Sequence, residues 1–219
     1  MIPLRDKNPS HTFPVVNTAL IVINALVFFY ELSLGGGLTR FILHFGLVPA
    51  YVTSDSVTTI DRTLPFFSSM FLHGGWLHLI GNMLYLYIFG DNVEDKIGHS
   101  KYLLFFLLSG IGAAITQIAA NASSEIPMIG ASGAISGVLA AYMLFFPRAR
   151  ILTLIPIFFF IQIIEIRAVY FLLIWFGMQF LSGVSTVASG AHGAGVAWWA
   201  HIGGFIVGIG LAYMFKKPK

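Results

Sequence analysis

The 219-residue chain has 57% apolar residues, only 10% charged residues and a mean hydropathy of +0.85. Soluble domains carry roughly 25% charged residues, so this composition excludes a soluble protein and predicts several membrane spans. The net charge of +3 comes without a basic run interleaved with aromatic residues, which argues against nucleic-acid binding. The lack of cysteine excludes disulfides, thiolate metal sites and thiol chemistry.

Windows without charged residues predict an all-α protein with six membrane-spanning helices. Four windows suit one crossing each, since about 20 apolar residues span a bilayer. The last window is long enough for two crossings, and the small residues of Ser182–Gly195 predict the loop between them. The predicted spans lie in Thr12–Tyr30, Met70–Gly90, Tyr102–Ser124, Ile126–Pro147 and, twice, in Ala168–Phe215.

Two further apolar stretches are predicted to lie at the membrane surface. Ile151–Ile164 is short for a span and has arginines on both sides, so it suits an interfacial or re-entrant segment. Leu38–Val52 lies in a long loop between the first two spans and has the polar breaks of an amphipathic interfacial helix. We therefore expect neither stretch to cross the membrane.

The lysine and arginine residues predict the orientation of the spans, because basic residues concentrate in cytoplasmic loops. With six spans and a cytoplasmic N-terminus, ten of the 12 basic residues lie inside, whereas a seventh span would move three lysines outside. We therefore expect both termini in the cytoplasm. The inner residues are Arg5, Lys7, Lys96, Lys101, Arg148, Arg150, Arg167, Lys216, Lys217 and Lys219, and the outer ones are Arg40 and Arg62.

A serine flanked by glycines lies just inside the fourth predicted span, in the segment Gly130–Gly137. A lone Ser132 would most simply donate a hydrogen bond to a carbonyl one turn earlier. However, His201 lies near the start of the sixth span, and His78 and Asn82 share one face of the second. The predicted orientation places all four in the outer half of the membrane, where polar groups are costly and usually functional.

Small residues at helical spacing predict that the fourth and sixth spans pack closely. Such stripes allow two helix backbones to touch. This contact would bring Ser132 and His201 within hydrogen-bond reach, as a serine nucleophile and its general base require. The stripes are Gly133 and Gly137 on the fourth span, and Gly204 and Gly208 on the sixth.

Acyl transfer also requires hydrogen-bond donors for an oxyanion. Ser132 lies near a helix N-terminus, where backbone N–H groups have no partner within the helix. The side chains of Asn82 and His78 supply further donors from the second span. These three residues are the predicted oxyanion site.

At these motifs the chain resembles the rhomboid family of intramembrane serine proteases. The resemblance covers essentially the whole chain and implies one rhomboid-type domain over residues 1–219. It implies Ser132 as the nucleophile, His201 as the general base, and His78 and Asn82, with the Ser132 N–H, as the oxyanion site. The matching residues are Gly130–Gly133, Ala200–Phe205, and His73, His78 and Asn82 on the second span, with the loop segment Gly90–Gly98.

The resemblance also implies partners and a location. The substrates would be transmembrane proteins, cut within the lipid bilayer near the outer end of a helix, and the fifth span with its following loop would gate access. The compact six-span core implies a bacterial inner membrane. No cofactor, metal ion or nucleic acid is expected as a partner.

Several alternatives remain open from the residues alone. A catalytically inert rhomboid-like protein would bind membrane helices without cutting them, and a transporter or proton relay would carry carboxylates deep in its spans. The polar residues of the spans fit neither a metalloprotease nor an aspartyl protease. His73 is either a further site member or a histidine at the surface, and His192 is expected in a solvent-facing loop.

Overall fold

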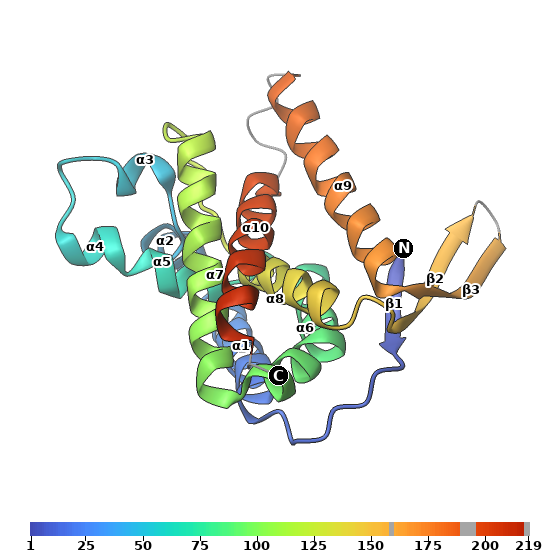
Figure 1. Ribbon diagram of the computed structural model, residues 1–219. Coiled ribbons are helices and arrows are strands. Elements are labelled where there is room, and N and C mark those ends of the chain that lie inside the picture. Colours follow the sequence, from blue (N-terminus) through green and yellow to red (C-terminus); the bar gives the residue numbers. More distant parts are fainter. Residues whose placement is uncertain (158–159, 189–195, 217–219) are drawn as a thin grey trace.

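The computed structural model describes residues 1–157, 160–188 and 196–216, and it is mostly helical (Figure 1). Each of its six long helices overlaps one predicted span. Shorter helices lie between the first two, and a small sheet joins the N-terminus to the chain between α8 and α9. The long helices are α1 (Val15–Ser33), α6 (Trp76–Ile97), α7 (His99–Ala120), α8 (Ser132–Phe145), α9 (Ala168–Ala188) and α10 (Trp198–Phe215).

Four of these helices, α1, α7, α9 and α10, are long and apolar enough to cross a membrane. They make the chain an integral membrane protein. α8 is apolar but has only 14 residues, and α6 ends in a charged segment that contains Asp91, Glu94, Asp95 and Lys96. The six crossings and the cytoplasmic position of both termini therefore stay predictions.

Several predicted boundaries are wrong, among them the start of α8 and the end of α9. α8 begins at Ser132 rather than near Ile126, because Gly130 adopts a φ of +115°, outside the helical region. The predicted loop Ser182–Gly195 is helical as far as Ala188, and residues 189–195 lie outside the described part of the chain. Small residues alone therefore did not end this helix.

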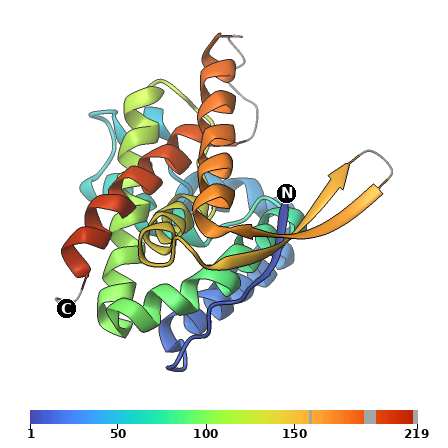
Figure 2. The same ribbon diagram turned by 45° about the vertical axis from the view of Figure 1, so that its right-hand side comes forward.

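A three-stranded antiparallel sheet departs from the all-α prediction. Its strands are β1 (Ile2–Asp6), β2 (Arg150–Ile157) and β3 (Phe160–Arg167), paired in that order. The run Ile151–Ile164, predicted as an interfacial or re-entrant segment, lies in the paired strands β2 and β3, and its position relative to the membrane stays a prediction. Its β-branched isoleucines and aromatic residues favour strands, and Pro156 disfavours a helix. The hairpin projects from the helices in both views (Figures 1 and 2).

Polar contacts hold this sheet against the helices. The Tyr142 hydroxyl on α8 donates a hydrogen bond of 2.5 Å to Asp6 at the end of β1. Burial raises the pKa of Asp6 to about 6. Lys7 pairs with Glu165 on β3, and this hydrogen bond lowers the pKa of the Glu165 carboxyl. The N-terminus is thus tied both to the bundle and to the hairpin.

The long loop between α1 and α6 folds into short helices. The predicted helix over Leu38–Val52 is divided in two, because the chain turns extended at Gly46. A Cβ atom at Gly46 would lie 2.5 Å from the carbonyl oxygen of Ile42. The elements of this loop are the 3₁₀ turn Gly35–Gly37, α2 (Leu38–Phe45), α3 (Pro49–Val52), α4 (Thr59–Thr63), α5 (Pro65–Ser68) and the 3₁₀ turn Ser69–Phe71.

α8 occupies the centre of the bundle, with every residue from Gly133 to Tyr142 buried. Its glycines allow direct backbone contact with α10. A Cβ atom at Gly204 would lie 1.9 Å from the Gly133 carbonyl oxygen, and one at Gly208 would lie 2.4 Å from the Gly137 Cα. The two small-residue stripes therefore face each other.

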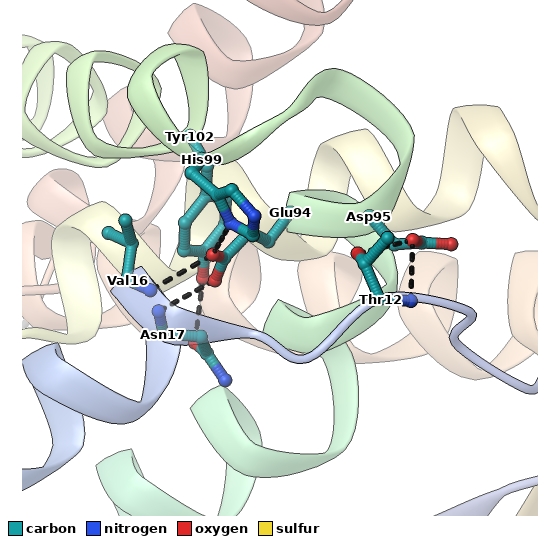
Figure 3. Close-up of polar contacts among 7 residues, drawn as sticks. All are labelled: Thr12, Val16, Asn17, Glu94, Asp95, His99 and Tyr102. Atoms are coloured by element: carbon teal, nitrogen blue, oxygen red, sulfur yellow. Dashed lines mark hydrogen bonds and ion pairs between the residues drawn. The ribbon is translucent and has the colours of Figure 1, made fainter.

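A buried carboxylate joins three helices on the side of the bundle drawn in Figure 3. Glu94 of α6 accepts hydrogen bonds from the N–H groups of Val16 and Asn17, at 2.9 and 2.7 Å, and also contacts His99 (Figure 3). An acidic group is favourable at the start of α1, where N–H groups lack helical partners. Tyr102 of α7 donates to the Asn17 side chain at 2.8 Å. These bonds fix α6, which carries His78 and Asn82.

We predict that Gly204→Val lowers thermal stability, because the new side chain cannot fit against the backbone of α8. Overpacking of this kind costs about 1–3 kcal/mol. Gly210→Val is the matched control on the same helix, since a Cβ atom there has nothing within 4 Å. Equal melting temperatures for the two variants in detergent would contradict the contact.

Candidate active site

Ser132 and His201 meet at the N-terminal ends of α8 and α10. Ser132 is the first residue of α8, and His201 lies in the first turn of α10. Their atoms Oγ and Nε2 are 2.8 Å apart, a normal hydrogen-bond length. The glycine contacts between α8 and α10 bring the two backbones close enough for this bond. The hydroxyl of Ser132 thus points to the imidazole rather than back along its own chain.

The other ring nitrogen of His201 also has a partner. Its Nδ1 lies 2.7 Å from the side-chain oxygen Oε1 of Gln179 on α9. Trp175, one turn earlier on α9, places its ring centroid 6.1 Å from that of His201. Sequence reasoning missed Gln179. The signal available was a polar residue in an apolar helix four residues after an aromatic one.

Two polar residues of the second predicted span, Asn82 and His73, form a network with Glu31 of α1. Asn82 on α6 lies with its Nδ2 atom 2.9 Å from Nε2 of His73. Two alternatives were open for His73, and the surface position is wrong, because the side chain is only 2% exposed. The backbone N–H of His73 donates to the buried carboxylate of Glu31 on α1, at 3.1 Å. His73 and Glu31 therefore restrict the orientation of the Asn82 amide.

His78 and Asn82 converge beside the backbone that leads into Ser132. A Cβ atom at Gly130 would lie 2.5 Å from Nε2 of His78 and 3.4 Å from Nδ2 of Asn82. The N–H of Gly74 donates to Nδ1 of His78 at 3.4 Å, which leaves Nε2 as the protonated nitrogen. Two side-chain donors thus lie next to the segment that precedes the serine.

These groups line one cavity of about 620 Å³. Its walls come from α6, α7, α8, α9 and α10 and from the segment before α8. Its size suits an extended stretch of polypeptide, and its lining combines apolar walls with a few convergent polar groups, as ligand sites do. The polar groups of the lining include His78, Asn82, Ser132, Gln179 and His201. His192 lies outside the described residues.

The arrangement is suited to acyl transfer. A neutral Nε2 can accept the proton of Ser132 Oγ and raise its nucleophilicity. Asn82 and His78 line the same cavity as Ser132, and the first N–H groups of α8 have no partner within the helix, so donors for an oxyanion are available there. Among the described residues, no aspartate or glutamate forms an ion pair with His201. The site thus combines a serine, a histidine and neutral donors.

Comparison with known proteins identifies the family. The family model of the Rhomboid domain matches residues 61–218. The chain is 30% identical to the Rhomboid protease AarA of Providencia stuartii, over 91% of this chain and 73% of AarA. It is 28% identical to the Rhomboid protease GluP of Bacillus subtilis, over 97% of this chain but 36% of GluP. It is 38% identical to Rhomboid-like protein 11 of Arabidopsis thaliana, over 36% of this chain and 28% of that protein. The chain therefore belongs to the rhomboid family of intramembrane serine proteases.

Proposed function

We propose that this protein cuts transmembrane proteins near the outer end of a membrane helix, with Ser132 as nucleophile and His201 as general base. The observation that carries the proposal is the 2.8 Å contact between Ser132 Oγ and His201 Nε2 inside a cavity lined by apolar helices. Family membership supplies the reaction class, hydrolysis of a peptide bond. The bacterial relatives favour a bacterial inner membrane.

The first half of the reaction forms an acyl-enzyme. Ser132 Oγ attacks the carbonyl carbon of the scissile bond while its proton passes to His201 Nε2. The carbonyl oxygen becomes negatively charged, and Asn82 Nδ2, His78 Nε2 and the Ser132 N–H donate hydrogen bonds to it. His201 then returns the proton to the leaving nitrogen, and the C–N bond breaks. An ester joins Ser132 to the new C-terminus.

The second half hydrolyses this ester. His201 removes a proton from water, and the resulting hydroxide attacks the ester carbonyl. The same donors stabilise the second oxyanion. Collapse of this intermediate returns the proton to Ser132 Oγ and releases the carboxylic acid. Neither step calls for a metal ion, a cofactor or an acidic residue.

The path of the substrate is proposed to pass α9. Many side chains along this helix face outward, among them Met178, Leu181 and Val187. In both views the C-terminal end of α9 rises beyond the other helices (Figures 1 and 2). A membrane-embedded substrate would reach Ser132 sideways from the bilayer when this part of α9 moves aside.

We predict that Ser132→Ala and His201→Ala each abolish cleavage of a model transmembrane substrate in detergent and leave the protein folded. Each change removes one partner of the proton transfer, and residual rates fall steeply when such a pair is broken. Ser136→Ala is the matched control, because its hydroxyl lies one turn further along α8 and, among the described residues, bonds only to the Ser132 carbonyl, at 2.7 Å. Near-normal turnover in either dyad variant would refute the assignment. Substrate binding without cleavage by the wild type would favour an inert helix-binding protein.

A second prediction concerns the oxyanion donors. Asn82→Ala should lower kcat by roughly 10²–10³, the usual effect of removing one donor. The nucleophile should stay reactive toward a fluorophosphonate probe, although more slowly. Asn24→Ala on α1 is the control, since within the described part of the chain that amide bonds only to its own helix, at the Leu20 carbonyl. Unchanged turnover in Asn82→Ala would remove Asn82 from the site.

The third prediction tests for an acidic partner. The outer carboxylates of the predicted topology should tolerate amide substitution within about tenfold, far from the 10⁴ loss seen when a triad aspartate is replaced. The Glu31 carboxylate accepts from the backbone N–H of His73 and not from His201, and glutamine keeps an oxygen that can accept this bond. A collapse of activity in one folded variant would reveal a triad. The variants are Glu31→Gln, Asp55→Asn, Asp61→Asn and Glu125→Gln.

A further inference from the structure

Gln179 is the polar member of the buried residues of α9. The others are Ala168, Phe171, Leu172 and Gly183, and Gln179 itself is 8% exposed. Its side chain reaches across to α10 and places Oε1 2.7 Å from Nδ1 of His201. A buried amide in an apolar helix is costly unless it has a partner. This contact supplies that partner.

We propose that Gln179 is the positioning residue for His201 and that it couples the histidine to the packing of α9. This inference rests on the proposed function and adds a condition to it. The histidine is held in its catalytic orientation while α9 packs against α10, and it is released when α9 moves away. Gln179 acts through His201 and does not contact the reacting atoms.

The chemistry of the amide oxygen fixes the proton on His201. A carbonyl oxygen can only accept a hydrogen bond, so Nδ1 must carry the hydrogen. In a neutral imidazole, Nε2 is then free to accept the proton of Ser132, which it faces at 2.8 Å. A serine protease commonly uses an aspartate for this task. A neutral glutamine performs it without the cost of a charge within the membrane.

The packing of α9 explains why the Gln179–His201 hydrogen bond depends on the position of α9 relative to α10. At its N-terminal end, α9 is anchored by Phe171 and Leu172, which are fully buried. Further along, it meets α10 at Phe176, whose ring centroid is 4.6 Å from that of Phe205, and at Gly183, beside Trp198. Gln179 lies between these two contacts. A displacement of this part of α9 therefore breaks the bond to His201.

The consequence is an ordered sequence of events. A transmembrane substrate that enters past α9 separates Gln179 from His201, so the base is not oriented while the cavity is open. Chemistry follows when α9 packs again and the hydrogen bond reforms. The same contact that closes the cavity thereby prepares the base.

The first test replaces the hydrogen-bond acceptor. Gln179→Met keeps the length of the side chain but offers at most a weak acceptor, and it should lower kcat about 10- to 100-fold with KM little changed, since it leaves a buried donor unpaired. Gln179→Glu keeps the acceptor and should restore most of kcat. Its acid limb should move to higher pH, because a carboxylate stabilises the imidazolium. Wild-type kcat in Gln179→Met would overturn the proposal.

A spectroscopic measurement separates positioning from general structural damage. The ¹⁵N shifts of His201, assigned by difference from His201→Ala, should report the Nδ1–H tautomer in the wild type. In Gln179→Met they should report a mixture of tautomers. An unchanged tautomer in Gln179→Met would overturn the proposal even if activity falls.

The second test displaces α9 but does not mutate Gln179. A Cβ atom at Gly183 would lie 3.4 Å from that of Trp198, so Gly183→Phe should wedge the helices apart. It should slow the reaction of a small fluorophosphonate probe as much as Gln179→Met does, and the double variant should lose no more than either single one. Gly177→Phe is the matched control, because a Cβ atom there has nothing within 4 Å. Full additivity would overturn the coupling.

Ser132→Ala in the same assays distinguishes failure of the proposed function from failure of the role proposed for Gln179. If Ser132→Ala still cleaves, the proposed function fails. If Ser132→Ala is inactive while Gln179→Met and Gly183→Phe behave as wild type, the dyad stands and the role of Gln179 alone is refuted.

Discussion

The contact on which the site depends is the meeting of α8 and α10 through glycine. Gly133 faces Gly204 and Gly137 faces Gly208, with no space for a Cβ atom between the backbones. Lipid gives helices no hydrophobic reason to associate, so close packing between backbones must supply the attraction. The same approach sets the 2.8 Å distance between Ser132 and His201, because each lies next to its stripe. The interface between α8 and α10 thus determines both the stability of the bundle and the geometry of the site.

Two buried carboxylates of the bundle accept hydrogen bonds from backbone N–H groups, and one of them leads to a candidate catalytic residue. Glu94 satisfies the first N–H groups of α1, and Glu31 satisfies that of His73. His73 in turn holds the Asn82 amide at 2.9 Å. A buried donor without a partner costs about 1–3 kcal/mol, so each bond restricts the next side chain. Asn82 is therefore oriented by groups that never meet a substrate.

The sequence was sufficient to locate the long helices and to place Ser132, His201, His78 and Asn82 near one another, because charge-free windows and helical spacing are properties of short segments. It was insufficient for the hairpin Arg150–Arg167, since an apolar run of that length suits a strand or a membrane-surface segment equally. It was insufficient for Gln179 for another reason. Which residue of α9 faces His201 depends on the rotation of that helix against α10, and this is decided by packing at Phe176 and Gly183.

The sheet restrains the N-terminal end of α9, and the contacts at the site restrain its later part. β3 ends at Arg167 and α9 begins at Ala168 without a loop, and the Ala168 N–H donates to the Ala149 carbonyl at 2.8 Å. The start of the helix is therefore fixed by covalent continuity and by the backbone. Its later part is held to α10 by the ring contacts of Trp175 and Phe176, by the close approach at Gly183 and by the Gln179–His201 bond. The Gln179–His201 bond therefore belongs to the part of α9 that is held by side-chain contacts alone, and this part also lines the cavity. In the proposed entry of a substrate past α9, these side-chain contacts are the ones that have to give way.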